Sequence, residues 1–217
     1  MKMRIASLSL LTILCLALSA PAFADLYNNG PTNGTYGAWL IGVGNYVVSD
    51  SFVPNASGNM MSFDIALWVE SGYTPLTVDW AVGTSSFGSD VASGSGSWTS
   101  LTLLCSNGQP FNGGICSGGS GYDIYDTNMS VGNLPVTAGN TYWLTLTSAT
   151  DSKPGGGNPA WDENFGPSLA YNLAEGSIPS ESFTINGGTT TPELSSIMLF
   201  GSGILGIAGV LRRKLKT

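Results

Sequence analysis

The sequence lacks histidine and has very little charge, and these absences exclude several kinds of chemistry. Only 10% of its 217 residues are charged. Without histidine there is no Ser-His or Cys-His catalytic pair and no imidazole ligand for a metal. The span from Asp25 to Glu193 contains all fourteen acidic residues and a single basic residue, Lys153, so its net charge is −13. A surface of that sign repels phosphate backbones, so we expect no nucleic-acid partner.

Residues 1–24 have the three parts of a secretory signal peptide. Lys2 and Arg4 supply positive charge, residues 5–18 are mostly apolar, and Ala22-Phe23-Ala24 places small residues at positions −3 and −1. The pattern predicts export and cleavage between Ala24 and Asp25. The alternative is an uncleaved N-terminal anchor, but the apolar run is shorter than the ~20 residues that span a bilayer.

The C-terminal residues 194–217 combine an apolar run with a basic tail. Residues 194–211 are apolar apart from Gly and Ser. As a helix they would be about 27 Å long, close to the thickness of a bilayer core. Arg212, Arg213 and Lys214 follow as a stop-transfer signal, which the positive-inside rule keeps in the cytoplasm. We expect a transmembrane helix with the acidic body on the far side of the membrane; a buried core helix is the alternative.

Pro192-Glu193, the apolar run and the basic tail together resemble the PEP-CTERM sorting signal. In that family a Pro-Glu-Pro motif, a transmembrane helix and an Arg-rich tail are recognised by an exosortase, a membrane transpeptidase-like enzyme of Gram-negative bacteria that make extracellular polysaccharide. Leu194 stands where the family has its second proline. The resemblance implies exosortase and the export machinery as partners, with either processing at Pro192 and Glu193 or a single-pass anchor. It places the body at the cell surface or outside the cell.

The body of the chain, residues 25–185, predicts an all-β domain. It shows no amphipathic helical period, and short β-rich runs alternate with Gly, Ser, Asn, Asp and Pro. Residues 186–193 then form a Gly/Thr linker with the sorting motif. We expect an antiparallel β-sandwich, jelly-roll or Ig-like in outline. The predicted strands are Trp39–Val43, Tyr46–Val53, Met61–Glu70, Pro75–Val82, Trp98–Leu104, Tyr122–Val131, Thr141–Thr147 and Ser180–Ile185.

Several short motifs in this body are similar to those of choice-of-anchor domains, a group of exported bacterial β domains found with different surface anchors. The similarity implies an extracellular β domain and transfers no catalytic residue. The motifs are Asp50-Ser51-Phe52, the segment 75–83, Gly121-Tyr122-Asp123-Ile124-Tyr125, the segment 141–146 and the segment 161–168.

Two cysteines, Cys105 and Cys116, remain once the signal peptide is removed. They flank a Gly-rich stretch between two predicted strands. In an exported chain this arrangement predicts a structural disulfide, which stabilises by about 3 kcal/mol in the chain-entropy model. A metal site is the weaker interpretation, because two thiolates supply only half of the four ligands that zinc takes.

The acidic residues suggest a calcium site as one hypothesis. Carboxylates and amides in the loops of secreted sandwiches suit a hard cation. The candidate ligands are Asp123 with Asp126, and Asp162 with Glu163. Neither stretch has the spacing of an EF-hand loop, and a solvated acidic loop is the alternative. Apart from Ca²⁺ we expect no cofactor.

The aromatic residues suggest glycan contact as a second hypothesis, with Trp68 and Trp161 as candidates. Sugar rings stack on exposed Trp and Tyr faces. Trp68 alternates with Phe63, Ile65 and Leu67 along its strand, which would direct it to the opposite face. The alternative is that these tryptophans belong to the core.

The sequence therefore predicts an exported structural or interaction protein of an extracellular polysaccharide matrix, and not an enzyme. A carbohydrate-binding module, with or without calcium, is one alternative. A glycoside hydrolase is another, but it needs two carboxylates about 5 Å or about 6.5–9.5 Å apart. We assign no catalytic residue.

Overall fold

The computed structural model describes residues 24–34, 37–106 and 121–188, which form thirteen β-strands and no helix. The predicted all-β class is thus confirmed for this part of the chain. Within those ranges we find no helix of a length and hydrophobicity that would let it cross a bilayer. The predicted signal peptide, sorting motif and C-terminal helix fall almost entirely outside the described residues.

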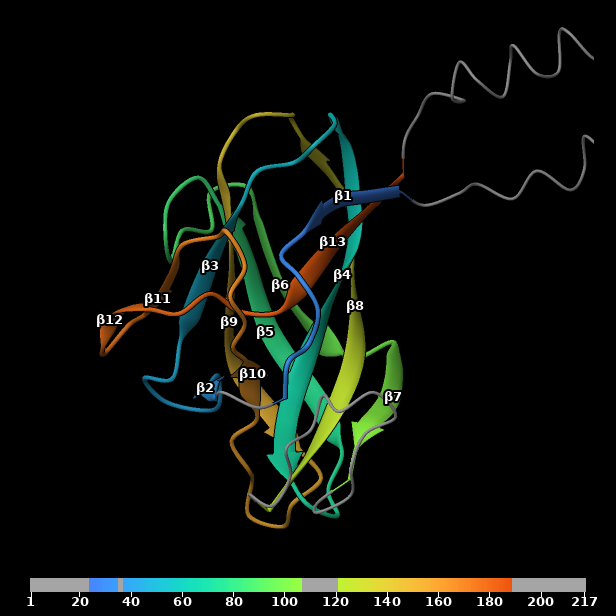
Figure 1. Ribbon diagram of the computed structural model, residues 1–217, viewed down its shortest axis with the longest axis vertical. Helices are drawn as coiled ribbons and strands as arrows, with labels where there is room; N and C mark the ends of the chain where they lie inside the picture. Colours follow the sequence, from blue (N-terminus) through green and yellow to red (C-terminus); the bar gives the residue numbers. More distant parts are fainter. Residues whose placement is uncertain (1–23, 35–36, 107–120, 189–217) are drawn as a thin grey trace, which may run out of the picture.

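The strands form two antiparallel sheets that pack face to face (Figure 1). The seven-stranded sheet, here sheet I, has the long β4 at its centre. One edge of β4 pairs first with β13 and then with β10, and its other edge pairs with β8. The members of sheet I are β1 (Ala24–Asn28), β2 (Ala38–Leu40), β4 (Gly58–Glu70), β7 (Ser100–Cys105), β8 (Tyr122–Val136), β10 (Ala160–Asp162) and β13 (Phe183–Gly188).

The six-stranded sheet, here sheet II, has the order β12-β11-β3-β9-β5-β6. Its strands are β3 (Val48–Phe52), β5 (Pro75–Gly83), β6 (Ala92–Ser97), β9 (Tyr142–Asp151), β11 (Ala170–Asn172) and β12 (Gly176–Ile178). The segment after β10 returns beside the start of β13, where Glu163 and Glu181 form an isolated antiparallel bridge.

The core lies between the two sheets and follows from the alternation of side chains along the strands. Phe63, Ile65, Leu67 and Val69 of β4 are at most 1% exposed, as the sequence predicted. Phe63, Ile65 and Leu67 pack in one cluster with residues of sheet II, which include Leu144. Full burial of each large side chain contributes about 1.5–3 kcal/mol, so this layer is the main source of stability.

Each of the eight predicted strands overlaps an observed strand, and five observed strands were not predicted: β1, β6, β10, β11 and β12. Three of those five are only three residues long. β6 consists of Ala, Ser and Gly alone and has no apolar pattern. These strands are defined by the neighbours with which they pair.

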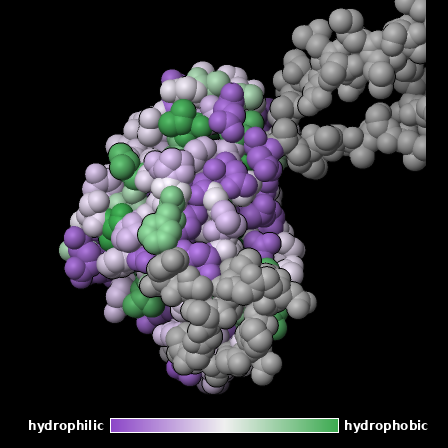
Figure 2. Space-filling model, in the orientation of Figure 1, coloured by the Kyte–Doolittle hydropathy of each residue, from purple (hydrophilic) through white to green (hydrophobic). Residues whose placement is uncertain are grey.

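β1 and β13 pair at one edge of sheet I, with Ala24 opposite Gly187 (Figure 1). The two ends of the described region therefore leave the sandwich side by side. Figure 2 shows apolar residues scattered among polar ones over the coloured part of this face, without one continuous apolar area.

Candidate functional site

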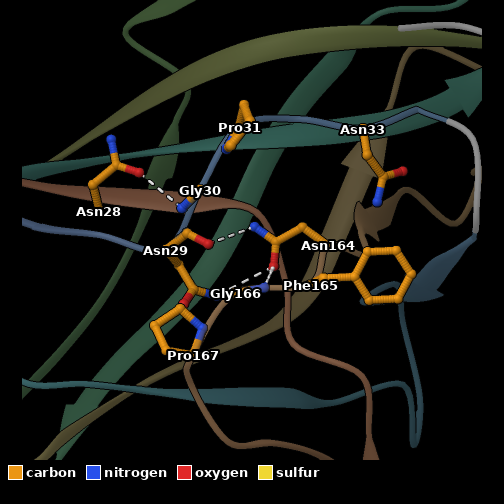
Figure 3. A pocket seen from close by; sticks show the side chains of 9 residues that line it. All are labelled: Asn28, Asn29, Gly30, Pro31, Asn33, Asn164, Phe165, Gly166 and Pro167. Atoms are coloured by element: carbon orange, nitrogen blue, oxygen red, sulfur yellow. Dashed lines mark hydrogen bonds between the residues drawn. The ribbon is translucent and has the colours of Figure 1, made fainter.

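A hollow of about 570 Å³ opens between the segment that follows β1 and the segment that follows β10. Its lining contains no charged side chain. It consists of Asn28, Asn29, Gly30, Pro31, Asn33, Asn164, Phe165, Gly166 and Pro167, and we call it the Asn/Phe hollow (Figure 3). Phe165 is 79% exposed, the highest value among the large apolar side chains of the described residues.

Two buried asparagines hold the walls of the hollow together. The Asn164 Nδ2 donates to the backbone oxygen of Asn29 (2.8 Å), and its Oδ1 accepts from the Gly166 N–H (2.8 Å) (Figure 3). The Nδ2 of Asn29 donates to the backbone oxygen of Glu181 (2.6 Å). The Nδ2 of Asn33 also donates to a backbone oxygen, that of Glu163. Because these three amides are used internally, the groups that face a ligand are Asn28 and Phe165.

Asn28 and Phe165 present different chemistry at the rim of the hollow. The Oδ1 of Asn28 accepts from the Gly30 N–H (2.8 Å), and its Nδ2 points away from that contact (Figure 3). The ring of Phe165 extends from the opposite wall toward Asn33 (Figure 3). An exposed ring beside amide groups offers a stacking face next to hydrogen-bond donors and acceptors, which is the combination that sugar rings require.

A pair of buried carboxyl groups lies one side chain away from the hollow. Asp50 points inward from β3, on the same face as Val48 and Phe52, and Glu181 points inward two residues before Phe183. Both are 0% exposed. The Glu181 N–H donates to Oδ2 of Asp50 (2.7 Å). Burial raises the pKa of Asp50 to about 6, and burial together with the charge of Asp50 raises the pKa of Glu181 well above its ordinary value.

Sequence reasoning missed this pair. The clue in the sequence was the alternation of side chains along the strand. In Val48-Ser49-Asp50-Ser51-Phe52, Asp50 lies on the same face as Val48 and Phe52. A carboxyl group at a core position between two apolar residues indicates a buried charge that needs a partner.

The candidate calcium ligands Asp162 and Glu163 are adjacent but lie on opposite faces of the strand. Asp162 faces outward, where it accepts from the Trp68 Nε1 (2.7 Å) and from the N–H groups of Asn33 (2.9 Å) and Gly34 (3.2 Å). Burial raises its pKa to about 6. Glu163 faces inward and accepts from the Trp39 Nε1 (2.6 Å).

The other two candidate ligands, Asp123 and Asp126, are also separated by the pleat of β8. Asp123 faces the inner side and accepts from the Gly72 N–H (2.9 Å) and from the Ser71 hydroxyl (3.1 Å). Asp126 faces outward beside a smaller hollow of about 110 Å³ that it shares with Asp64. Partial burial and the charge of Asp64 raise the pKa of Asp126. In the described part of the chain, no set of three or more Asp, Glu or Cys side chains is arranged to hold a metal.

The two candidate tryptophans differ in exposure. Trp68 lies on the outer face of sheet I, half-buried, 5.9 Å from the ring of Tyr122. Trp161 is 0% exposed, and its Nε1 donates to the backbone oxygen of Ser182 (2.8 Å). A fully buried ring cannot contact a glycan, so the expectation for Trp161 is wrong. Trp161 faces inward because it alternates with the outward Ala160 and Asp162.

The remaining candidates lie at or beyond the edges of the described residues. Cys105 ends β7 and is 5% exposed, whereas Cys116 lies outside the described ranges, so the disulfide stays a prediction. Asp25 lies in β1, opposite Asn186. Pro192, Glu193, Arg212, Arg213 and Lys214 are outside the described residues.

No protein-family model matches this sequence, and no curated protein does. The class of protein is therefore defined by the structure alone: a two-layer antiparallel β-sandwich with an uncharged hollow and a buried pair of acids.

Proposed function

We propose that this chain is an exported cell-surface protein that binds extracellular polysaccharide through the Asn/Phe hollow. One observation carries the proposal: an aromatic ring that is 79% exposed borders a hollow lined otherwise by Asn, Gly and Pro. Leaving a large apolar ring exposed is unfavourable in water, and a sugar ring stacked on it would cover that surface.

The absence of charge in the lining suits a polymer recognised by its hydroxyl groups. Amides both donate and accept, as do hydroxyl groups, so Asn28 matches a sugar without a fixed charge. The domain as a whole carries thirteen net negative charges between Asp25 and Glu193. Such a surface weakens attraction to anionic polymers and keeps the protein soluble in a hydrated matrix.

The cellular address is part of the same proposal and rests on the sequence. The signal peptide would direct export, and exosortase would recognise Pro192 and Glu193. Removal of residues 1–24 leaves Asp25 inside β1, still opposite Asn186 in the sheet, so processing there is compatible with the fold. The finer description as a jelly-roll or Ig-like choice-of-anchor domain belongs to this proposal and is supported by the two antiparallel layers.

Binding is better supported than catalysis. The facing carboxyl groups of Asp50 and Glu181 are both 0% exposed, out of reach of a polymer. A glycosidase needs its two carboxyl groups on either side of a bound glycosidic bond. The outer-face pair Trp68 and Tyr122 remains a second candidate surface for the same glycan.

The test is a glycan array followed by titration calorimetry, with the full chain, with and without Ca²⁺, and with polysaccharide from the native host. We expect saturable binding that Phe165→Ala weakens at least tenfold and Asn28→Ala weakens less. Leu173→Ala removes a side chain that is 54% exposed and lies outside the hollow, so it should bind like the unmodified chain.

Two results would overturn the proposed site. If Trp68→Ala abolishes binding and Phe165→Ala does not, the glycan lies on the outer face of sheet I. If no glycan binds, the hollow is not a polysaccharide site. The address is tested separately by mass spectrometry of the cell-surface form, which shows whether the chain ends near Glu193 or at Thr217.

A further inference from the structure

The interior of the sandwich contains a cluster of oxygen atoms without hydrogen-bond partners. They are Oδ1 of Asp50, Oγ of Ser168, and both Oε1 and Oε2 of Glu181. The Asp50 and Glu181 side chains are each 0% exposed. Buried polar atoms are almost always paired, because an unpaired one has lost its hydration without replacement. Four such atoms on three residues indicate a missing partner.

The three residues converge from three different segments. Asp50 and Glu181 are joined by the hydrogen bond from the Glu181 N–H to the Asp50 carboxylate (2.7 Å). The hydroxyl of Ser168 lies beside the Asp50 carboxyl and the Tyr27 hydroxyl, and its interaction with each of them lowers their pKa values. The Tyr27 hydroxyl is nearby, since burial and the charge of Asp50 raise its pKa to about 12.

Among the residues that the structure describes, no basic side chain neutralises this cluster. Lys153 is the single basic residue between Asp25 and Glu193, and it pairs with Glu70 at the surface. The other charges that act on Glu181, from Asp162 and Glu163, are also negative. Two carboxyl groups in a low-dielectric interior need either protons or a bound cation to cancel their charge.

We propose that Asp50, Ser168 and Glu181 bind one Ca²⁺ between the two sheets. The four unpaired atoms of this cluster are all oxygens, the donors that a hard cation prefers; one further unpaired buried atom of the described residues, the Trp98 Nε1, belongs to a ring that packs against Phe63. Ca²⁺ accepts irregular sets of carboxylate, hydroxyl and water oxygens, whereas Mg²⁺ demands near-ideal octahedral geometry. This site differs from the loop carboxylates that the sequence suggested.

The site adjoins the Asn/Phe hollow through Asn29. The Asn29 Nδ2 donates to the Glu181 backbone oxygen (2.6 Å), and its Oδ1 accepts from the Ser168 N–H (3.3 Å). A cation bound to Glu181 and Ser168 would thus fix the same two segments that hold one wall of the hollow. The cation proposal nevertheless stands apart from glycan binding, because its test contains no glycan.

The experiment measures cation binding directly on the full chain. The protein is stripped with EDTA, returned to ~0.15 M salt to screen surface charge, and titrated with Ca²⁺ by calorimetry. Tb³⁺ luminescence, sensitised by the nearby Tyr27, gives an independent optical signal that Ca²⁺ should displace. Glu181→Gln and Ser168→Ala alter the site, and Glu175→Gln removes an equal charge at an exposed position.

We expect one Ca²⁺ per chain and a melting temperature that rises by about 5 °C or more at a hundredfold excess over Kd. Glu181→Gln should weaken binding at least tenfold and Ser168→Ala less, whereas Glu175→Gln should bind normally. If Glu181→Gln does not fold, Asp50→Asn takes its place in the comparison.

Two outcomes would overturn the site. The first is that the unmodified chain shows no saturable binding of Ca²⁺, and that Glu181→Gln raises the melting temperature by the same amount in Ca²⁺ and in EDTA. That result would show that protons alone neutralise the pair. The second is binding that survives both Glu181→Gln and Asp50→Asn, which would place the ion elsewhere.

Discussion

The indole N–H of Trp68 donates a hydrogen bond to Oδ1 of Asp162 (2.7 Å) and so joins β4 to β10 on the outer face of sheet I. Asp162 is fully buried and also accepts from the backbone N–H groups of Asn33 and Gly34. One carboxylate therefore serves three donors. It ties the segment that follows β1, which lines the Asn/Phe hollow, to the middle of the sheet.

Replacing Asp162 by alanine should destabilise the domain by about 3 kcal/mol, because each buried donor left without a partner costs about 1–3 kcal/mol. The Trp68 indole and two backbone N–H groups would lose their acceptor. Urea denaturation at pH 7.5 measures the change. Glu175→Ala removes an exposed carboxylate and should leave the midpoint unchanged; an unchanged midpoint in Asp162→Ala as well would contradict the structural role.

The two candidate tryptophans should respond differently to truncation. Trp161 fills the core and packs edge-on against Phe183, with ring centroids 5.6 Å apart. Trp161→Ala should therefore cost about 3–5 kcal/mol, as large cavities in cores do. Trp68 is half-buried, so Trp68→Ala should cost clearly less. Equal losses in the two variants, measured by denaturant unfolding, would mean that the outer face is as tightly packed as the core.

The fold could be predicted because apolar and polar residues alternate along the strands. Met61–Glu70 alternates apolar and polar residues, and the structure forms β4 there with the predicted inward face. β6 could not be predicted, because its side chains are Ser and Gly with one Ala. It forms because β5 offers an unpaired edge, and its glycines fit where larger residues would not.

The candidate site was less predictable than the fold. Phe165 and Glu181 come from segments outside any long strand, and they approach Asn28 and Asp50 only through the pairing of distant strands. A sequence pattern records which face a residue takes within its strand. It does not record which strands meet across the core, so the buried acids were not brought together.

In EDTA the protein should lose stability as the pH rises from about 4 to about 7. The folded-state pKa values of Asp50 and Asp162 are about 6, above the ordinary value of 3.8, so the folded state holds protons that the unfolded chain has released. Their contribution is fully present below pH 3.8 and is lost as the pH passes 6. For Asp50 the loss is about 3 kcal/mol. Glu181, whose pKa is also raised, extends the decline to higher pH.

Guanidine unfolding at a series of pH values measures this decline. The Tyr27 and Ser168 hydroxyls lie beside Asp50, and the charges of Asp162 and Glu163 act on Glu181. Asp50→Asn removes one titrating carboxyl and should flatten the curve between pH 4 and pH 7. Stability that instead increased over this interval would mean that the carboxyl groups are stabilised in their ionised form.

Gly94 and Gly96 of β6 differ in the side chain that an added Cβ atom would meet, which is rigid at position 94 and flexible at position 96. A Cβ atom at position 94 would lie 2.9 Å from Cζ2 of Trp80, whose ring is held in the core. At position 96 the nearest atom is the Sδ of Met129, at 3.3 Å, in a side chain that can change rotamer. Gly94→Ala should therefore cost about 1–3 kcal/mol through overpacking, and Gly96→Ala markedly less. Thermal unfolding of both variants measures this difference. An equal loss of stability in the two variants would show that β6 moves away from Trp80 as a unit.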